Sequence, residues 1–207
     1  MLAACTPGVR SHHEEPKALQ PMNSPSVFDA KQTLRRTVRR TILQLTDAER
    51  QAQSQAIVSA LASHPFCQQA RSVLLFHPLP DEPDITPLFR MWQDEKQLLL
   101  PVIREGEMWA RPFDARVPLT VGAFSIQEPA CPDHGADVAA DLVIVPGRAF
   151  DKLGNRMGRG KGFYDRFFAR ALWQNVPKIG VGYPCQLLSH VPAEPFDVRM
   201  TCLVTGL

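Results

Sequence analysis

The chain has 207 residues, of which 44% are hydrophobic and 21% are charged, and its formal net charge is +2. This length suits one globular domain with a sizeable core, and the near-neutral charge excludes a general electrostatic attraction to nucleic acid or membranes. No apolar run approaches the roughly 18–20 residues that span a bilayer. The five cysteines are scattered and lack C-x-x-C spacing, which argues against a disulfide framework or structural zinc site and indicates a reducing cytoplasm.

Residues 1–29 contain four prolines, two adjacent histidines and no hydrophobic period. Such a segment buries too little apolar surface to offset the entropy of ordering, so we expect a disordered N-terminal extension. Residues 30–207 show no repeat and no linker and are predicted to form a single α/β domain.

Helical spacing of apolar residues begins after this extension. It predicts a helix over residues 31–45, and the capping-box pattern of Thr46 and Glu49 predicts a second helix that runs to about Ser63. Short apolar runs then predict strands over residues 72–76, 97–103, 108–113, 141–145, 178–182 and 199–205, and helices over residues 84–94 and 164–173. The last helix has an apolar stripe of Phe167, Phe168 and Leu172. Strands that alternate with helices predict a layered, largely parallel sheet flanked by helices.

A glycine-rich loop lies between the strand at 141–145 and the helix at 164–173. Its residues Gly158, Gly160 and Gly162 permit torsions closed to other residues and let main-chain N–H groups approach an anion. The following helix directs its positive end toward the same place. The spacing is not that of a Walker A loop, since Gly162 stands where Ser or Thr is required.

Charged side chains are interleaved with these glycines. Arg156, Arg159 and Lys161 can neutralise the charge on a transferred phosphoryl group. Asp165 adds a hard oxygen ligand, and magnesium commonly reaches phosphates through one or two carboxylates. A tight, exposed turn with chance basic residues is the alternative, but three cations and a carboxylate together favour a phosphate site.

The segment 146–166 resembles the signature of the 5-formyltetrahydrofolate cyclo-ligases (methenyltetrahydrofolate synthetases), which reads approximately P-G-x-A-F-D-x-x-G-x-R-x-G-x-G-x-G-[YF]-Y-D. The resemblance extends from about Lys31 to the C-terminus. It implies a NagB/RpiA/CoA-transferase-like (Rossmann-like) fold and a magnesium-dependent ligase of folate one-carbon metabolism. Such an enzyme converts 5-formyltetrahydrofolate and ATP into 5,10-methenyltetrahydrofolate, ADP and phosphate.

Residues 31–35 match the family's N-terminal K-x-x-L-R, which is implicated in ATP binding. Lys31, Arg35 and Arg39 share one helical face. A solvated face or a weak nucleic-acid contact is the alternative to ATP binding for these cations. The segment lacks aromatic residues for base stacking, which disfavours nucleic acid. The resemblance implies an ATP site formed by Lys31, Gln32, Thr33, Leu34, Arg35, Arg156, Met157, Gly158, Arg159, Gly160, Lys161, Gly162, Phe163 and Tyr164.

Two further segments resemble parts of the family that bind the folate. In residues 77–86, Glu82 would hold the pterin, because a carboxylate can accept hydrogen bonds from two neighbouring N–H donors. On local grounds, the alternative of an acidic turn that caps a helix at Thr86 is equally consistent with the segment. In residues 124–129, Phe124 would stack on the folate, with a plain core phenylalanine as the alternative. The implied folate-binding residues are His77, Glu82, Phe124, Arg159, Gly160, Lys161, Gly162 and Phe163.

The segment 191–197 resembles V-P-x-E-x-x-D, which implies that Asp197 joins Asp165 at the magnesium ion. Thr201 stands where the family often carries another acid. The implied catalytic residues are Arg159 and Lys161, which would steady the γ-phosphoryl group, and Tyr164, which would lie against the reacting groups.

Two alternatives to this function stay open. A sugar-phosphate isomerase or CoA-transferase-like enzyme would use the anion loop without a nucleotide, and a nucleic-acid-binding module would use the basic cluster of residues 31–40. We expect instead a cytoplasmic monomer that binds reduced folate and ATP and has no nucleic-acid or membrane partner.

Overall fold

The computed structural model of the protein describes residues 26–130 and 138–206. Helix α1 (Val27–Gln44) begins directly after Ser26, whose hydroxyl oxygen accepts a hydrogen bond from the backbone N–H of Asp29. Residues 27–29 are therefore helical, and their assignment to a disordered extension is wrong, because Ser26 acts as the N-cap of α1. The rest of that extension, residues 1–25, lies outside the described residues. No helix within the described ranges is long and apolar enough to cross a membrane.

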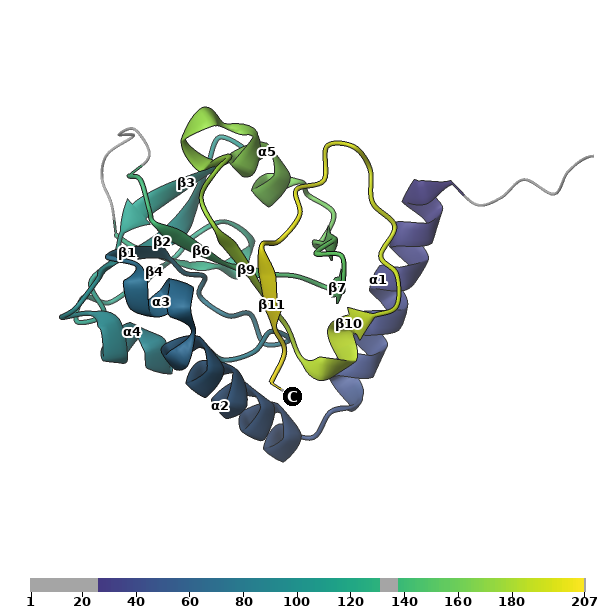
Figure 1. Ribbon diagram of the computed structural model, residues 1–207, viewed down its shortest axis with the longest axis horizontal. Coiled ribbons are helices and arrows are strands. Elements are labelled where there is room, and N and C mark those ends of the chain that lie inside the picture. Colours follow the sequence, from purple (N-terminus) through teal and green to yellow (C-terminus); the bar gives the residue numbers. More distant parts are fainter. Residues whose placement is uncertain (1–25, 131–137, 207) are drawn as a thin grey trace, which may run out of the picture.

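A six-stranded sheet lies at the centre of the molecule (Figure 1). Its strands follow the order β11-β9-β6-β1-β2-β3, and every neighbouring pair is parallel except β2 and β3. The strands are β1 (Ser72–Leu74), β2 (Gln97–Arg104), β3 (Glu107–Pro112), β6 (Leu142–Pro146), β9 (Lys178–Val181) and β11 (Cys202–Val204). The prediction of a largely parallel sheet is confirmed.

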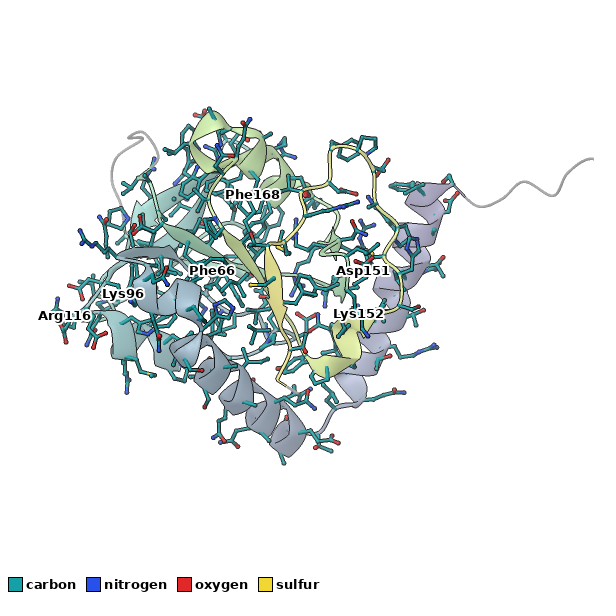
Figure 2. The ribbon with its side chains drawn as sticks, in the orientation of Figure 1. Phe66, Lys96, Arg116, Asp151, Lys152 and Phe168 are labelled. Carbon is teal, nitrogen blue, oxygen red and sulfur yellow. The ribbon has the colours of Figure 1, made fainter. Side chains whose placement is uncertain are left out.

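Helices pack on both faces of this sheet. Helices α2 (Asp47–Ser63), α3 (Pro65–Gln69) and α4 (Pro87–Trp92) contribute to the apolar cluster on one face, and α5 (Phe163–Ala169) contributes to the cluster on the other. Strand β6 supplies both clusters, because successive side chains of a strand point to opposite faces. Leu142 and Ile144 therefore pack on the α2 side, whereas Val143 and Val145 pack on the side of α5, where Phe168 is buried (Figure 2).

Helix α1 packs away from the main sheet, against a second sheet of strands β10, β7 and β8. Val38 and Ile42 of α1 are buried against this layer. The strands are β7 (Ala149–Asp151), β8 (Arg156–Met157) and β10 (Leu187–Leu188), and a separate hairpin pairs β4 (Thr120–Val121) with β5 (Gln127–Glu128). None of these short strands was predicted. The glycine-rich loop follows β8 directly and therefore lies close to α1.

The helix predicted over residues 164–173 is divided in two. Helix α5 ends at Ala169 because Arg170 adopts an extended conformation with ψ 139°, and a 3₁₀ turn follows at Ala171–Trp173. Leu172 is consequently 46% exposed, and its assignment to the apolar stripe is wrong. The buried aromatic residue of this segment is Trp173, whose ring lies 4.4 Å from that of Phe167.

The predicted helix at 84–94 is also shorter, because Pro87 occupies its first turn and fixes where α4 begins. Thr86 precedes the helix without forming a side-chain cap; instead its backbone N–H donates to Asp84 Oδ1 at 2.9 Å. The predicted strands at 72–76 and 199–205 shorten to β1 and β11.

Candidate active site

A cavity of about 580 Å³ opens beyond the carboxyl ends of β1 and β6. Its walls come from α1, the loop after β1, the turn between β4 and β5, the glycine-rich loop with the start of α5, and the segment before β11. Ligands of open α/β sheets bind in this position. The predicted site residues that line it are Lys31, Arg35, His77, Glu82, Phe124, Arg156, Met157, Gly158, Arg159, Gly160, Lys161, Gly162, Phe163, Tyr164, Asp165 and Asp197.

Three predicted residues of the K-x-x-L-R segment do not line this cavity. Gln32 and Thr33 are exposed, and Leu34 packs against the apolar cluster beneath α1. The helix explains why Arg35 joins Lys31, since residues four positions apart share a face, whereas Gln32 and Thr33 point away from that face. Lys31 and Arg35 are the two that face the cavity.

The glycine-rich loop is fixed from the side of α1. Gly160 and Gly162 have φ angles of 95° and 68°, which an L-residue adopts only with strain. Arg35 Nε donates to the carbonyl oxygen of Gly158 at 3.0 Å, and a β-carbon on Gly160 would lie 3.4 Å from Arg35 Cζ. Two of the predicted glycines are therefore required by backbone conformation, and α1 holds the loop at the cavity.

The two predicted metal ligands converge. Asp165 Oδ1 accepts a hydrogen bond of 3.4 Å from the backbone N–H of Val198, the residue next to Asp197. Arg156 Nη2 lies 3.3 Å from both oxygens of Asp165. Lys31 Nζ pairs with Asp197 and, at 2.8 Å, with Glu194 Oε2. Each of the two carboxylates therefore pairs with a cation in this structure.

This donor set fits magnesium bound together with a phosphorylated ligand. No group of three or more His, Cys, Asp or Glu side chains among the described residues forms a cage that could hold a metal alone. Magnesium needs no such cage, since it usually combines one or two carboxylates with water and phosphate oxygens. Thr201 does not contribute: its hydroxyl accepts from the N–H of Lys178 at 2.9 Å, and it does not line the cavity.

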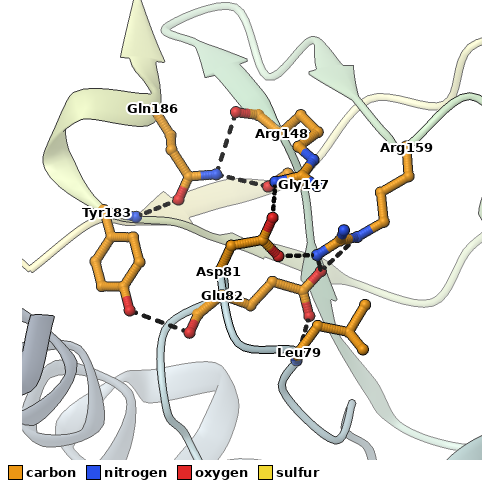
Figure 3. Close-up of polar contacts among 8 residues, drawn as sticks. All are labelled: Leu79, Asp81, Glu82, Gly147, Arg148, Arg159, Tyr183 and Gln186. Atoms are coloured by element: carbon orange, nitrogen blue, oxygen red, sulfur yellow. Dashed lines mark hydrogen bonds and ion pairs between the residues drawn. The ribbon is translucent and has the colours of Figure 1, made fainter. Parts of the chain in front are cut away.

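A charged junction joins the glycine-rich loop to the loop after β1 (Figure 3). Arg159 Nε and Nη2 donate to Glu82 Oε1 at 3.0 and 2.8 Å, and Nη2 also donates to Asp81. Asp81 in turn accepts from Arg148. The two residues assigned to phosphate and to pterin are thus in direct contact in this structure.

Aromatic side chains form part of the cavity wall. Phe124 is 58% exposed, so the alternative prediction, that it is a plain core phenylalanine, is wrong. Its ring lies 5.6 Å from the ring of Phe163 and 5.8 Å from Lys161 Nζ. Phe124 also adopts a φ of 58°, an uncommon conformation for a bulky residue.

Burial raises the pKa of the Tyr164 hydroxyl, which therefore stays protonated. Burial also lowers the pKa of His77, which favours a neutral imidazole.

Several cavity residues escaped sequence reasoning. Phe28 and Phe196 are 67% and 66% exposed at the cavity wall. Phe28 precedes Lys31 by three residues and so shares its helical face, but its place within residues 1–29, which were expected to be disordered, hid this signal. Glu194 is the glutamate of the V-P-x-E-x-x-D motif, where only the aspartate was assigned a role. Asp81 does not line the cavity itself but pairs with Arg159, which does; its only sequence signal is its place beside Glu82.

The parallel sheet and the cavity at its carboxyl end define an α/β enzyme with a small-molecule site. The 5-formyltetrahydrofolate cyclo-ligase family matches residues 27–206, and this chain belongs to that family. The family and the fold class predicted from the sequence are confirmed.

Individual relatives agree with this assignment. The 5-formyltetrahydrofolate cyclo-ligase of Escherichia coli (strain K12) is 30% identical over 169 residues, which cover 78% of this chain and 92% of the relative. That of Mycolicibacterium smegmatis is 30% identical over 186 residues, with coverage of 85% and 93%. The solved structure of Aquifex aeolicus 5,10-methenyltetrahydrofolate synthetase superimposes with a TM-score of 0.75 and 36% identity, covering 85% of this chain and 89% of that one. The corresponding Mycoplasma pneumoniae structure has a TM-score of 0.66 at 21% identity, which supports the fold.

Proposed function

We propose that this protein catalyses the ATP-dependent cyclisation of 5-formyltetrahydrofolate to 5,10-methenyltetrahydrofolate, with release of ADP and phosphate. Family membership supports the reaction. One observation supports its location: the cationic glycine-rich loop and Glu82 line the same cavity, so a triphosphate and a reduced pterin can lie side by side. The enzyme's contribution is then mainly positioning and charge stabilisation.

In this proposal the γ-phosphoryl group of ATP is transferred to the oxygen of the N5-formyl group. N10 attacks the activated carbon and releases its proton to water, and the C–O bond breaks with its electron pair leaving on phosphate. Lys161 and Arg159 stabilise the charge on the transferred group. Glu82 accepts hydrogen bonds from the pterin, Phe124 contacts a flat face of the folate, and the protonated Tyr164 is a hydrogen-bond donor beside the reacting groups.

Magnesium completes the proposed site. Asp165 and Asp197 would hold the ion together with phosphate oxygens, and the bound ion would neutralise charge on the triphosphate. Arg156 and Lys31 pair with these carboxylates in the ligand-free protein, and in this proposal they exchange those partners for phosphate oxygens when ATP binds. Lys31 remains a cation: burial would lower its pKa, but the hydrogen bonds to Asp197 and Glu194 outweigh burial and raise it.

The decisive experiment is a spectrophotometric assay of the purified protein with 5-formyltetrahydrofolate, ATP and magnesium. We expect the near-ultraviolet absorbance of the methenyl product to grow at a rate proportional to enzyme concentration. Omitting ATP or chelating the metal should stop the reaction. Turnover of a phosphosugar without ATP, and no methenyl product in the complete mixture, would instead support the isomerase or transferase alternative.

A further inference from the structure

The junction between Arg159 and the loop after β1 presents a problem of hydrogen-bonding capacity. A carboxylate has about four acceptor positions, two on each oxygen. Glu82 Oε1 already accepts from Nε and Nη2 of Arg159, and Glu82 Oε2 accepts from the backbone N–H of Leu79 at 3.0 Å. A pterin that offers two neighbouring N–H groups needs one position on each oxygen. At least one N–H of Arg159 must therefore leave Glu82 when the folate binds.

Asp81 is the second acceptor that Arg159 already uses. Arg159 Nη2 donates to Asp81 Oδ1, while Asp81 Oδ2 accepts from Arg148 Nη1 (Figure 3). Burial would raise the pKa of Asp81, but the hydrogen bonds from Arg159 and Arg148 outweigh it and leave the pKa lowered. Asp81 is therefore an ionised acceptor that can retain the guanidinium group of Arg159 after Glu82 is taken by a ligand.

The surrounding contacts fix Asp81 in place. The backbone N–H of Arg148 donates to the carbonyl of Met157 at 2.7 Å, and the fully buried Gln186 donates to the carbonyl oxygen of Arg148 at 3.1 Å. The hydroxyl of Tyr183 donates to the backbone carbonyl of Glu82 at 3.1 Å. These hydrogen bonds hold the loop after β1 and the segment around Arg148 in place beside Asp81 (Figure 3).

We propose that Asp81 is a positioning residue that receives Arg159 from Glu82 when the folate binds, so that Glu82 is released to the pterin while Arg159 stays at the cavity. This inference rests on the proposed function. Without the charge of Asp81, Arg159 has Glu82 as its one remaining carboxylate partner at this junction, and a charge-assisted pair through two N–H groups is strong. The folate must then displace Arg159 from that carboxylate, so its binding weakens.

The test compares the Asp81→Asn enzyme with the wild type by steady-state kinetics. We expect the KM for 5-formyltetrahydrofolate to rise about tenfold and the KM for ATP to stay within about twofold, since the lost carboxylate acts on Glu82. Asp81→Glu, which keeps the charge, should recover most of the folate affinity. Asp114→Asn is the matched control, because Asp114 also pairs with an arginine, Arg116, but outside the cavity.

An unchanged folate KM in Asp81→Asn would overturn the inference, as would an equal rise in both KM values, which indicates general loosening. If Asp81→Asn does not fold, Asp81→Ser is measured in its place; failure of both to fold would assign Asp81 to stability and likewise overturn the inference. A wild-type enzyme without methenyl product contradicts the proposed function itself. A wild-type enzyme that cyclises, with an Asp81→Asn variant of unchanged folate KM, contradicts only the positioning role.

Discussion

The central strands and the loops at their carboxyl ends are stabilised by different forces. Strands β1 and β6 consist largely of apolar side chains that pack on both faces of the sheet and are excluded from water. The loops carry arginines paired with carboxylates from distant segments, as in the pairs of Arg159 with Glu82 and of Arg148 with Asp81. Substitutions in the sheet should therefore change stability and spare turnover, whereas substitutions of loop cations should do the reverse.

The largest effect is expected at Lys161. This side chain is exposed on the glycine-rich loop and lines the cavity, so Lys161→Ala removes a phosphoryl-stabilising charge without disturbing the core. We expect kcat to fall by about 10³-fold, in line with the loss of one preorganised electrostatic donor. The midpoint of thermal unfolding should stay unchanged. Lys152→Ala, which removes an exposed lysine outside this cavity, is the control. Normal cyclisation by Lys161→Ala would remove Lys161 from the mechanism.

The complementary effect is expected in the sheet at Ile144. This fully buried residue of β6 belongs to the cluster beneath α2. Ile144→Ala should lower the free energy of unfolding by about 3 kcal/mol, and Ile144→Val by about 1 kcal/mol, because each deleted methyl group leaves a cavity. Denaturant unfolding measures the loss, and the KM values of the folded fraction should match the wild type. Altered KM values with normal stability would contradict the division between sheet and loops.

Asp151 combines features of the sheet and of the loops, since it is a buried residue whose charge supports a loop. Its oxygens accept from the backbone N–H groups of Leu153, Asn155 and Val191 and from the side chain of Asn155. Burial would raise its pKa, but these hydrogen bonds outweigh burial and lower it below the ordinary 3.8. Its contribution is therefore complete above that value and is lost as the pH falls through the lowered pKa.

We expect Asp151→Asn to lower the free energy of unfolding by about 2 kcal/mol near neutrality, because donors to a buried carboxylate lose their charged partner. The difference from the wild type should shrink in denaturant titrations as the pH falls below 3.8. Asp47→Asn, at an exposed position of α2, is the control. A stability difference that is independent of pH would show that shape rather than charge matters at this position.

The same division explains what the sequence could predict. Long, strongly patterned elements were found, and the capping box of Thr46 and Glu49 is present with both of its hydrogen bonds. Strands β7, β8 and β10 were missed, because two or three residues are too few to show a period. Leu172 was misplaced because the break at Arg170 depends on tertiary packing rather than on local spacing.

The candidate site divides in the same way. The residues of the glycine-rich loop were found because they lie together in one motif, and most of them line the cavity. The pairing of Arg159 with Asp81 was not predicted, because these two residues are 78 positions apart in the sequence, and Asp81 and its second partner Arg148 are 67 positions apart. Ion pairs between such distant segments form only when the sheet brings its loops together, and no local pattern announces them.

The smallest effect is expected at Phe124, an apolar side chain that lies in a loop rather than in the sheet. Phe124 is an exposed aromatic residue at the cavity wall, so Phe124→Ala should leave the free energy of unfolding nearly unchanged. The KM for 5-formyltetrahydrofolate should rise about fivefold, because an aromatic contact contributes about 1 kcal/mol. Phe124→Tyr should retain the wild-type KM, since it keeps the flat face. Phe66→Ala is the control, because Phe66 is a partly exposed phenylalanine on α3 that does not line the cavity. A rise in the KM for ATP instead of the folate would place the nucleotide, rather than the folate, against Phe124.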